Sequence, residues 1–400
     1  MARLTRAELQ ERTRAKVLAA AREEFAEHGY DAARIDGIAE RAELTRGAVY
    51  SNFPGKRALY FTVLADLAEA DQPAPPDGPP YGPFDGTSDD TYDNAYAGTG
   101  GASGEPGRET RETLAAFARA WVTRLPLATD DRHGEARLGR DLMPVIIADE
   151  LTRRPFAQLV RLNALLLGLT LERPPRTGPA GARKVRLAQT ALTLLHGASR
   201  LAAAAPGFTE PFDVVTACGR LADLDLDDAW HPPTAFTPAL PADQAWAPPA
   251  AQDTLRDEPA LLTGDGVVAV VGLHRLAAAE EAVRAAPPGT HVTAVLVTGT
   301  PAELTPLARL ALADLRRCLR QAIPTASWPP LQVVHDPHGE LAAAAGVPAV
   351  SDGTEAAVRI ERGRIVARAD GLGACHAAAT TETGTPHRHA APSSTPSCTP

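Results

Sequence analysis

The chain has 400 residues, and its 49 Asp and Glu against 40 Lys and Arg give a net charge of -9, which disfavours general affinity for nucleic acid. Its length predicts roughly two or three domains, and a hydrophobic fraction of 44% is sufficient to build their cores. No stretch approaches the about 20 apolar residues of a membrane span, and the N-terminus has no signal-peptide core. The four cysteines form no Cys-x-x-Cys pair, which predicts a reduced, cytoplasmic chain.

Four helices are predicted in the first 70 residues. Apolar residues recur at helical spacing over 12–28 and again over 35–42, with Gly29 as the C-cap of the first segment. Thr45 is a good N-cap for a third helix that runs through Phe53, and a fourth helix follows directly. The short turn before Thr45 is typical of a helix-turn-helix domain, whose reading helix enters the major groove of DNA.

The third predicted helix has an apolar face and a polar face. Val49 and Phe53 serve the core, which leaves the polar side chains for bases and phosphates. The candidate DNA-binding residues are Arg34, Thr45, Arg46, Gly47, Tyr50, Asn52, Phe53 and Lys56. Gly47 lets the backbone approach a phosphate, and Lys56 adds charge beside the N-terminus of the fourth helix. The alternative interpretation of this segment is an ordinary helix end with no DNA contact.

The run RTRAKVLAAAREEFAEHGYDAARIDGIAERA, followed by LTRGAVYSNFPGKRALY, resembles the N-terminal domain of TetR-type transcriptional regulators. The resemblance covers 12–67 and places the motif at about 34–53. It implies a ligand-responsive homodimer, a repressor or an activator, that binds a palindromic double-stranded DNA operator and a small-molecule effector. Ala33-Arg34 departs from the family pattern, in which Thr or Ser caps the second helix, and leaves Arg34 as a phosphate contact.

Residues 71–108 are rich in Pro, Gly and Asp and predict a disordered linker. Helical periodicity returns over 109–228, which we expect to form the ligand-binding and dimerisation domain. The helices are predicted at 110–128, 134–149, 155–171, 182–204 and 211–225. The candidate effector-binding residues are Trp121, Met143 and Asn163, with Arg124 and His196 as further polar candidates. Each of these is also explained by ordinary packing in a helical core.

Small residues in the last two helices, Gly197, Ala198, Gly219 and Ala222, would permit the close packing of a dimer bundle. Plain core packing within one subunit predicts the same stripes. The dimer is therefore implied mainly by the resemblance.

A Pro-rich linker is predicted over 229–258, and beyond it the period changes to that of an α/β domain at 259–375. The strands are predicted at 267–271, 292–297, 331–334, 356–360 and 365–368, and the helices at 275–286 and 302–321. DPHGELAAAAGVP, followed by AAVRIERGRIVARADGLG, resembles the C-terminal half of thioredoxin-like domains of the peroxiredoxin type. His274 occupies the region where such a domain would carry its nucleophilic cysteine, so we expect no thiol chemistry.

The sequence thus predicts a multidomain chain: an all-α helix-turn-helix domain at 10–70, the helical domain, the thioredoxin-like domain, and a disordered tail at 376–400. We expect a DNA-binding regulator that is not an enzyme and has no cofactor, metal site or membrane contact. The alternatives are a thiol redox sensor or enzyme and a DNA-binding module that tethers a protein partner. Because few contacts should cross the Pro-rich boundary, a chain ending near Asp228 is expected to fold.

Overall fold

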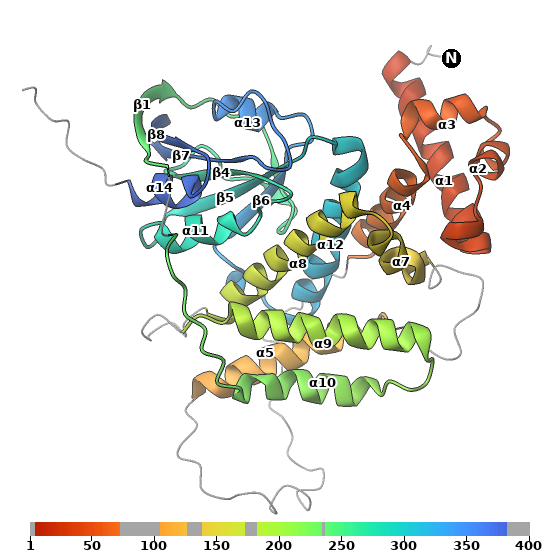
Figure 1. Cartoon of the computed structure of the whole chain (residues 1–400), viewed down its shortest axis with the longest axis horizontal. Helices are drawn as coiled ribbons and strands as arrows, with labels where there is room; N and C mark the ends of the chain where they lie inside the picture. The colour runs from red at the N-terminus through yellow and green to blue at the C-terminus, as the bar shows by residue number, and fades with distance from the viewer. Residues whose placement is uncertain (1–4, 73–104, 126–137, 173–181, 234–236, 382–400) are drawn as a thin grey trace, which may run out of the picture.

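A computed structural model describes residues 5–72, 105–125, 138–172, 182–233 and 237–381. It contains a group of N-terminal helices, a set of longer helices, and a mixed sheet covered by helices (Figure 1). Within those ranges, no helix has the length and apolar character that crossing a membrane would require. The tail at 382–400 and residues 73–104 of the predicted linker lie outside the described residues.

The N-terminal helices are α1 (Arg6–Ala32), α2 (Ile35–Arg41), α3 (Arg46–Asn52) and α4 (Lys56–Ala70). The first begins earlier than the apolar pattern predicts, because Thr5 and Glu8 form a capping box. It is interrupted at Gly29, whose φ of 74° favours glycine. The predicted cap at Thr45 is present, whereas Gly29 is a kink inside α1 and not its C-cap, which is Ala33.

The start of α2 has no side-chain cap of its own, as Arg34 at the N-cap position predicts. The buried carboxylate of Glu24 in α1 takes that role: it accepts a hydrogen bond from the Arg34 backbone N–H at 3.1 Å and another from Arg41 Nε at 2.9 Å. Gly37 leaves room for this carboxylate, because a Cβ there would lie 2.7 Å from Glu24 Oε1. A residue of the first helix thus fixes the position of the second.

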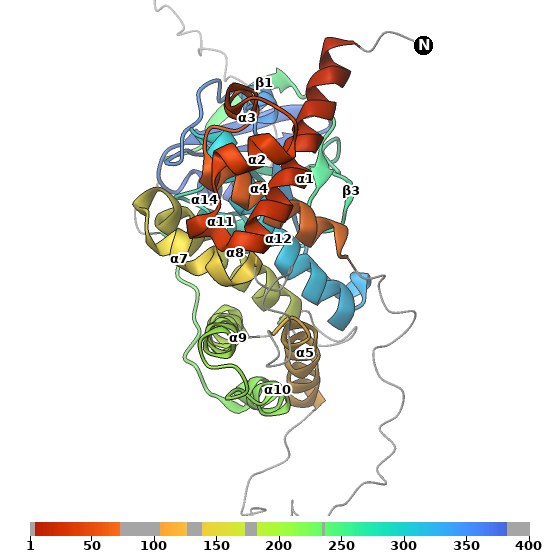
Figure 2. The same ribbon diagram turned by 90° about the vertical axis from the view of Figure 1, so that its right-hand side faces the viewer.

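The middle of the chain is helical, as its periodicity predicts. Its elements are α5 (Glu105–Val122), η2 (Gly139–Asp141), α7 (Leu142–Ile147), α8 (Glu150–Leu171), α9 (Val185–Ala204), α10 (Pro211–Arg220) and η3 (Leu221–Asp223). Since α5 already begins at Glu105, the predicted linker is too long at its C-terminal end. Figure 2 shows α5, α9 and α10 end-on, as a bundle below α8.

Gly219 does not face outward as a dimer contact. A Cβ at this position would lie 3.3 Å from Ala115 Cβ and 3.4 Å from the Arg111 carbonyl oxygen, both in α5. Its small size therefore serves packing inside the subunit. Gly197 differs, because a Cβ there would meet no atom within 4 Å.

The sheet has the strand order β1-β8-β7-β4-β5-β6. Its strands are β1 (Leu240–Ala245), β4 (Gly266–Gly272), β5 (His291–Val297), β6 (Leu331–His335), β7 (Glu355–Glu361) and β8 (Arg364–Asp370). Strands β4, β5 and β6 are parallel, whereas β7, β8 and β1 join by antiparallel pairing. All five predicted strands are present, and Arg362 and Gly363, both with positive φ, form the hairpin turn between β7 and β8.

Helices cover both faces of this sheet: α11 (Ala278–Ala285), α12 (Pro301–Ala322), η4 (Thr325–Ser327), α13 (Glu340–Ala344) and α14 (Ala374–Thr380). The short pair β2 (Gln252–Asp253) and β3 (Glu258–Pro259) lies beside β6. Two predicted boundaries need correction. The Pro-rich segment 229–258 contributes β1 to the sheet, and α14 includes 376–380 of the predicted tail. A mixed α/β region is confirmed, and its thioredoxin-like nature stays a prediction.

Helix α12 joins the sheet region to the rest of the molecule. It packs against α4, α5 and α8, and one hydrophobic core runs through all of them. Its position between the sheet and the other helices can be followed in Figure 1. Helix α4 is buried on all sides between Ala58 and Ala65, because α12 covers the side that the other helices leave open. The expectation that few contacts cross the Pro-rich boundary is wrong.

Candidate nucleic-acid interface

Helix α3 is fixed to the domain by its apolar face. Val49 is 1% exposed and Phe53 3% exposed, and the Arg14 guanidinium lies 4.4 Å from the centroid of the Phe53 ring. Arg14 Nη1 also donates a hydrogen bond to the Asn52 carbonyl oxygen at 3.5 Å. Phe53 was among the predicted DNA contacts, and this expectation is corrected: its ring is part of the core that holds α3 in place.

The opposite face of α3 presents Arg46 and Tyr50 together. The side chain of Arg46 is 61% exposed and Tyr50 is 44% exposed. The Arg46 Cζ lies 5.5 Å from the centroid of the Tyr50 ring, and Arg46 Nη1 lies 3.5 Å from Asp36 Oδ1 in α2. The aromatic ring and the carboxylate orient a guanidinium group that stays open to a ligand in solvent.

Three further predicted residues shape the same helix. Thr45 is its N-cap, since Thr45 Oγ1 accepts a hydrogen bond from the Ala48 N–H at 3.2 Å. The half-buried side-chain amide of Asn52 is hydrogen-bonded within α3, because its Nδ2 donates to the Ala48 carbonyl oxygen at 2.8 Å. Gly47 is exposed, and a Cβ there would meet only Thr45 Oγ1, at 3.8 Å. The first turn of α3 therefore has backbone accessible to a phosphate group.

Lys56 lies elsewhere than the sequence suggests. Its ammonium group donates to the carbonyl oxygens of Tyr30 at 2.7 Å, Asp31 at 3.2 Å and Ala33 at 3.2 Å, and it lies 4.5 Å from the Tyr30 ring centroid. These are the carbonyls left open where α1 ends. The expectation of a phosphate contact is corrected, because all three donors of the ammonium are used inside the domain. Arg34, by contrast, is exposed.

The candidate effector-binding residues all line one open cavity of about 1050 Å³. It lies among α4, α5, α7, α8, α9 and α12, and Trp121, Met143 and Asn163 reach it from three different helices. Arg124 and His196 line it as well. Sequence reasoning did not include the α12 residues in this wall, because nothing in the local pattern of a helix shows which distant segment it will meet.

Polar groups in this cavity are held by specific partners. Trp121 Nε1 donates to Ser199 Oγ at 2.8 Å, and the Trp121 and His196 rings meet edge to face with centroids 4.8 Å apart. Burial lowers the pKa of His196, although the Asp314 carboxylate opposes this change, so the imidazole is neutral at pH 7. The cavity can therefore take a mainly apolar molecule.

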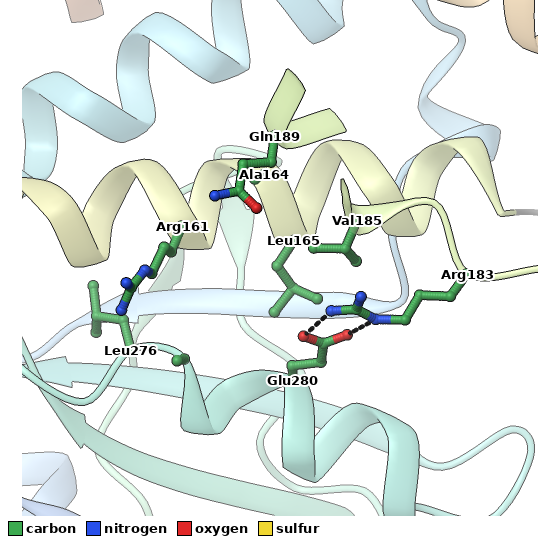
Figure 3. A pocket seen from close by; sticks show the side chains of 9 residues that line it. Arg161, Ala164, Leu165, Arg183, Val185, Gln189, Leu276 and Glu280 are labelled. Atoms are coloured by element: carbon green, nitrogen blue, oxygen red, sulfur yellow. Dashed lines mark hydrogen bonds and ion pairs between the residues drawn. The ribbon is translucent and has the colours of Figure 1, made fainter. Parts of the chain in front are cut away.

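A second, smaller crevice of about 150 Å³ lies between α8, α9 and α11 (Figure 3). At one end the Arg183 guanidinium forms a two-pronged ion pair with Glu280, at 2.7 Å and 2.8 Å. Arg284 of α11 pairs in the same way with Glu172, at the end of α8. These ion pairs connect α11 to the helical region. They are a second connection between the sheet region and the helical region, in addition to the packing of α12.

The cysteines of the sheet region are poorly placed for thiol chemistry. Cys318 and Cys375 are buried, and burial raises the pKa of the Cys318 thiol to about 12. Burial likewise raises the pKa of Cys375, with the carboxylates of Glu355 and Glu281 adding to it. Cys398 lies outside the described residues. Within the described ranges, no three His, Cys, Asp or Glu side chains are grouped so that they could hold a metal ion.

The geometry of α1 to α4 defines a helix-turn-helix DNA-binding domain, with α3 as its exposed reading helix. Residues 17–63 match the family model described as bacterial regulatory proteins, tetR family. The chain is 48% identical over 65 residues to the HTH-type transcriptional regulator SrpR of Pseudomonas putida, and equally to the uncharacterized HTH-type transcriptional regulator TtgW from a strain of the same species. The chain therefore carries the N-terminal domain of TetR-type transcriptional regulators, as its motifs indicate.

Each of these two matches covers 16% of the chain, and the chain spans only 30% of the length of SrpR and 48% of that of TtgW. Among solved structures, the chain is similar to NalD, the secondary repressor of the MexAB-OprM multidrug efflux pump in Pseudomonas aeruginosa, with 19% identity and a TM-score of 0.32. That alignment covers 53% of this chain and 95% of NalD.

Proposed function

We propose that the protein is a cytoplasmic, ligand-responsive repressor of transcription that binds a palindromic DNA operator as a homodimer and has no catalytic activity. The observation that carries this proposal is the outward pair Arg46 and Tyr50 on a helix whose other face is anchored by Val49 and Phe53. A bidentate guanidinium and a phenol are suited to base edges and phosphates in a major groove. Together with Thr45, Gly47 and Arg34 they form the proposed DNA-binding surface.

The proposed dimer rests on the apolar surface of α9 and α10. Leu201 of α9 is 43% exposed, Phe212 of α10 is 80% exposed, and Phe208, in the connection between the two helices, is 73% exposed. Exposed large apolar side chains that gather on one face mark protein–protein contacts. A second copy of the chain packed there would hold two reading helices together. To bind a palindromic operator, these two helices must match half-sites about 34 Å apart.

The decisive experiment combines selection of DNA sequences bound by the purified protein with titration of two variants. We expect Arg46→Ala and Tyr50→Ala each to weaken binding to the selected operator by about 5- to 150-fold, equivalent to about 1–3 kcal/mol for a lost base contact. Their thermal stability should stay that of the wild type, because both side chains are exposed. The matched control is Arg153→Ala, an exposed arginine at the start of α8, which should leave DNA binding unchanged.

If neither substitution changes the affinity, α3 is not the reading helix and the proposed DNA-binding surface is wrong. The ligand-responsive part of the proposal requires a small molecule that occupies the cavity and also releases the operator. A molecule that binds but leaves DNA affinity unchanged would contradict only that part.

A further inference from the structure

We propose that α12, a helix of the sheet region, is a wall of the effector cavity, and that the cavity takes an apolar molecule with a hydrogen-bond donor at its buried end. The inference rests on the proposed ligand-responsive function and assigns to the sheet region a direct part in it. The family model matches residues 17–63 and therefore does not include α12.

The wall is made by one face of α12. Leu307, Leu310 and Ala311 line the cavity from this helix, and Asp314 and Arg317 continue the line by one turn. Helix α4, which packs against α12, contributes Leu64, Leu67 and Ala68 to the same lining. A chain without the sheet region would lose this side of the cavity and open it to solvent.

The most buried polar side chain in the lining is Asn163 of α8, which is 8% exposed. Its Nδ2 donates to the Ala311 carbonyl oxygen of α12 at 3.0 Å, whereas its Oδ1 has no hydrogen-bond partner among the described residues. A buried amide oxygen without a partner is unfavourable by about 1–3 kcal/mol, so it is a natural acceptor for a ligand group. Nearby, Asp314 Oδ1 lies 2.5 Å from Arg124 Nη1, which neutralises the two charges.

The surroundings of Asn163 define the class of ligand. The apolar part of the lining is made by Leu64, Leu67, Leu125, Leu142, Met143, Phe156, Val160, Leu307 and Leu310, and the charged residues Arg22, Asp71, Arg140, Arg200 and Arg317 line the cavity as well. His196 is neutral, and the charges of Arg124 and Asp314 balance each other. The part of the cavity around Asn163 therefore favours an uncharged ligand group. A hydroxyl or N–H on an aromatic or aliphatic body satisfies both the apolar lining and the free Oδ1.

The same helix also connects the cavity to the DNA-binding domain. Arg309 Nε donates to Glu69 at 3.0 Å, and Arg309 Nη2 lies 2.8 Å from Asp66, both carboxylates belonging to α4. Nearer the start of α4, Arg57 pairs with Glu303 of α12 at 3.1 Å and with Asp149. A ligand that displaces α12 therefore acts on α4, the helix that leads directly from the reading helix.

The test uses the full chain and the fluorescent probe N-phenyl-1-naphthylamine, an apolar molecule with one N–H. We expect saturable binding to the wild type, and displacement by 1-naphthol at about fivefold or more lower concentration than by 1-methoxynaphthalene, which lacks the donor. In Asn163→Leu this preference should disappear while the probe still binds. Absence of saturable binding to the wild type, or a preference for 1-naphthol that survives Asn163→Leu, would overturn the ligand class.

The wall is tested separately by Leu310→Trp, which places an indole in the cavity from α12. We expect at least a tenfold loss of probe affinity, with Ala302→Trp, at the exposed start of α12, as the matched control. Operator binding without probe and the circular dichroism melting curve report whether each variant is folded. If Leu310→Trp does not fold, Ala311→Leu replaces it as the variant that narrows the cavity. Wild-type probe affinity in a folded cavity variant would refute the wall. If the probe results hold but no ligand releases DNA, only the proposed ligand response fails.

Discussion

Replacing Lys56 by Met removes an ammonium group while keeping most of the apolar stem. The structure allows the effect to be estimated, because Lys56 Nζ makes hydrogen bonds to two half-buried carbonyl oxygens, those of Tyr30 and Ala33, and to the more exposed one of Asp31. Water can replace the bond to Asp31. Each of the other two contributes about 1 kcal/mol, and the contact with the Tyr30 ring adds about 0.5–1 kcal/mol.

We therefore expect Lys56→Met to lower the free energy of unfolding by about 2–3 kcal/mol. This corresponds to a fall in Tm of roughly 4–12 °C for a cooperative unit of 150–250 residues, measured by circular dichroism. Since the ammonium is engaged within the domain, the salt dependence of operator binding should not change. Arg34→Met is the matched comparison, because its exposed guanidinium is a proposed phosphate contact and its loss should reduce the salt slope by about 0.9 for each contact.

The assignment of the Lys56 ammonium to contacts within the domain is wrong if Lys56→Met melts at the wild-type temperature and reduces the salt slope as Arg34→Met does. In that case the ammonium leaves the end of α1 when DNA binds and contacts a phosphate. Fluorescence anisotropy titrations at several salt concentrations separate the two results.

Three further predictions concern other parts of the molecule. Phe212→Glu should convert the dimer to a monomer in light scattering with little change in Tm, whereas Gly219→Ala should lower Tm through its contact with α5 and leave the dimer intact. A chain ending at Asp228 should aggregate or melt early, because it exposes the apolar sides of α4, α5 and α8 that α12 covers; a soluble dimer with wild-type operator affinity would contradict this. Burial, together with the nearby charge of Arg309, lowers the pKa of His335 to about 4 in the folded chain. The pKa in the unfolded chain is near 6.5, so the unfolded chain binds the proton at a higher pH than the folded chain does. Stability should then fall by up to about 1 kcal/mol per pH unit between pH 6.5 and 4, and urea titrations should show a shallower fall in His335→Gln.

The DNA-binding domain could be predicted closely from its sequence because its signals are local. The cap at Thr45, the kink at Gly29 and the alternation of Val49 and Phe53 with polar residues each act within one or two helical turns. The five strands from β4 to β8 were predictable for the same reason, since short runs of β-branched residues bounded by turns carry their own signal. The edge strand β1 was not, because its Pro-rich segment has no such pattern and is held by pairing with β8.

Side-chain roles within those elements depended on what each residue meets. Phe53 and Lys56 have the residue types of a DNA contact, yet the Phe53 ring packs in the core under Arg14, and the half-buried ammonium of Lys56 is bonded to the end of α1. Gly219 has the size required at a helix interface, and only the structure shows that the neighbouring helix is α5 of the same chain. Residue type limits the chemistry of a side chain, whereas its partner is set by segments far away in sequence.

The sequence by itself determined the helix-turn-helix domain, the helical character of the middle, and the strands of the sheet, because hydrophobic periodicity and capping are encoded over a few residues. Only the tertiary structure decided how these parts combine. Helix α12 has a periodicity that fits burial against any apolar surface, and the surface it meets is that of α4, α5 and α8. Burial of apolar area is non-directional, so it favours association without specifying the partner. The contact that makes a single core from two apparent domains, and encloses the cavity between them, is therefore a property of the folded chain.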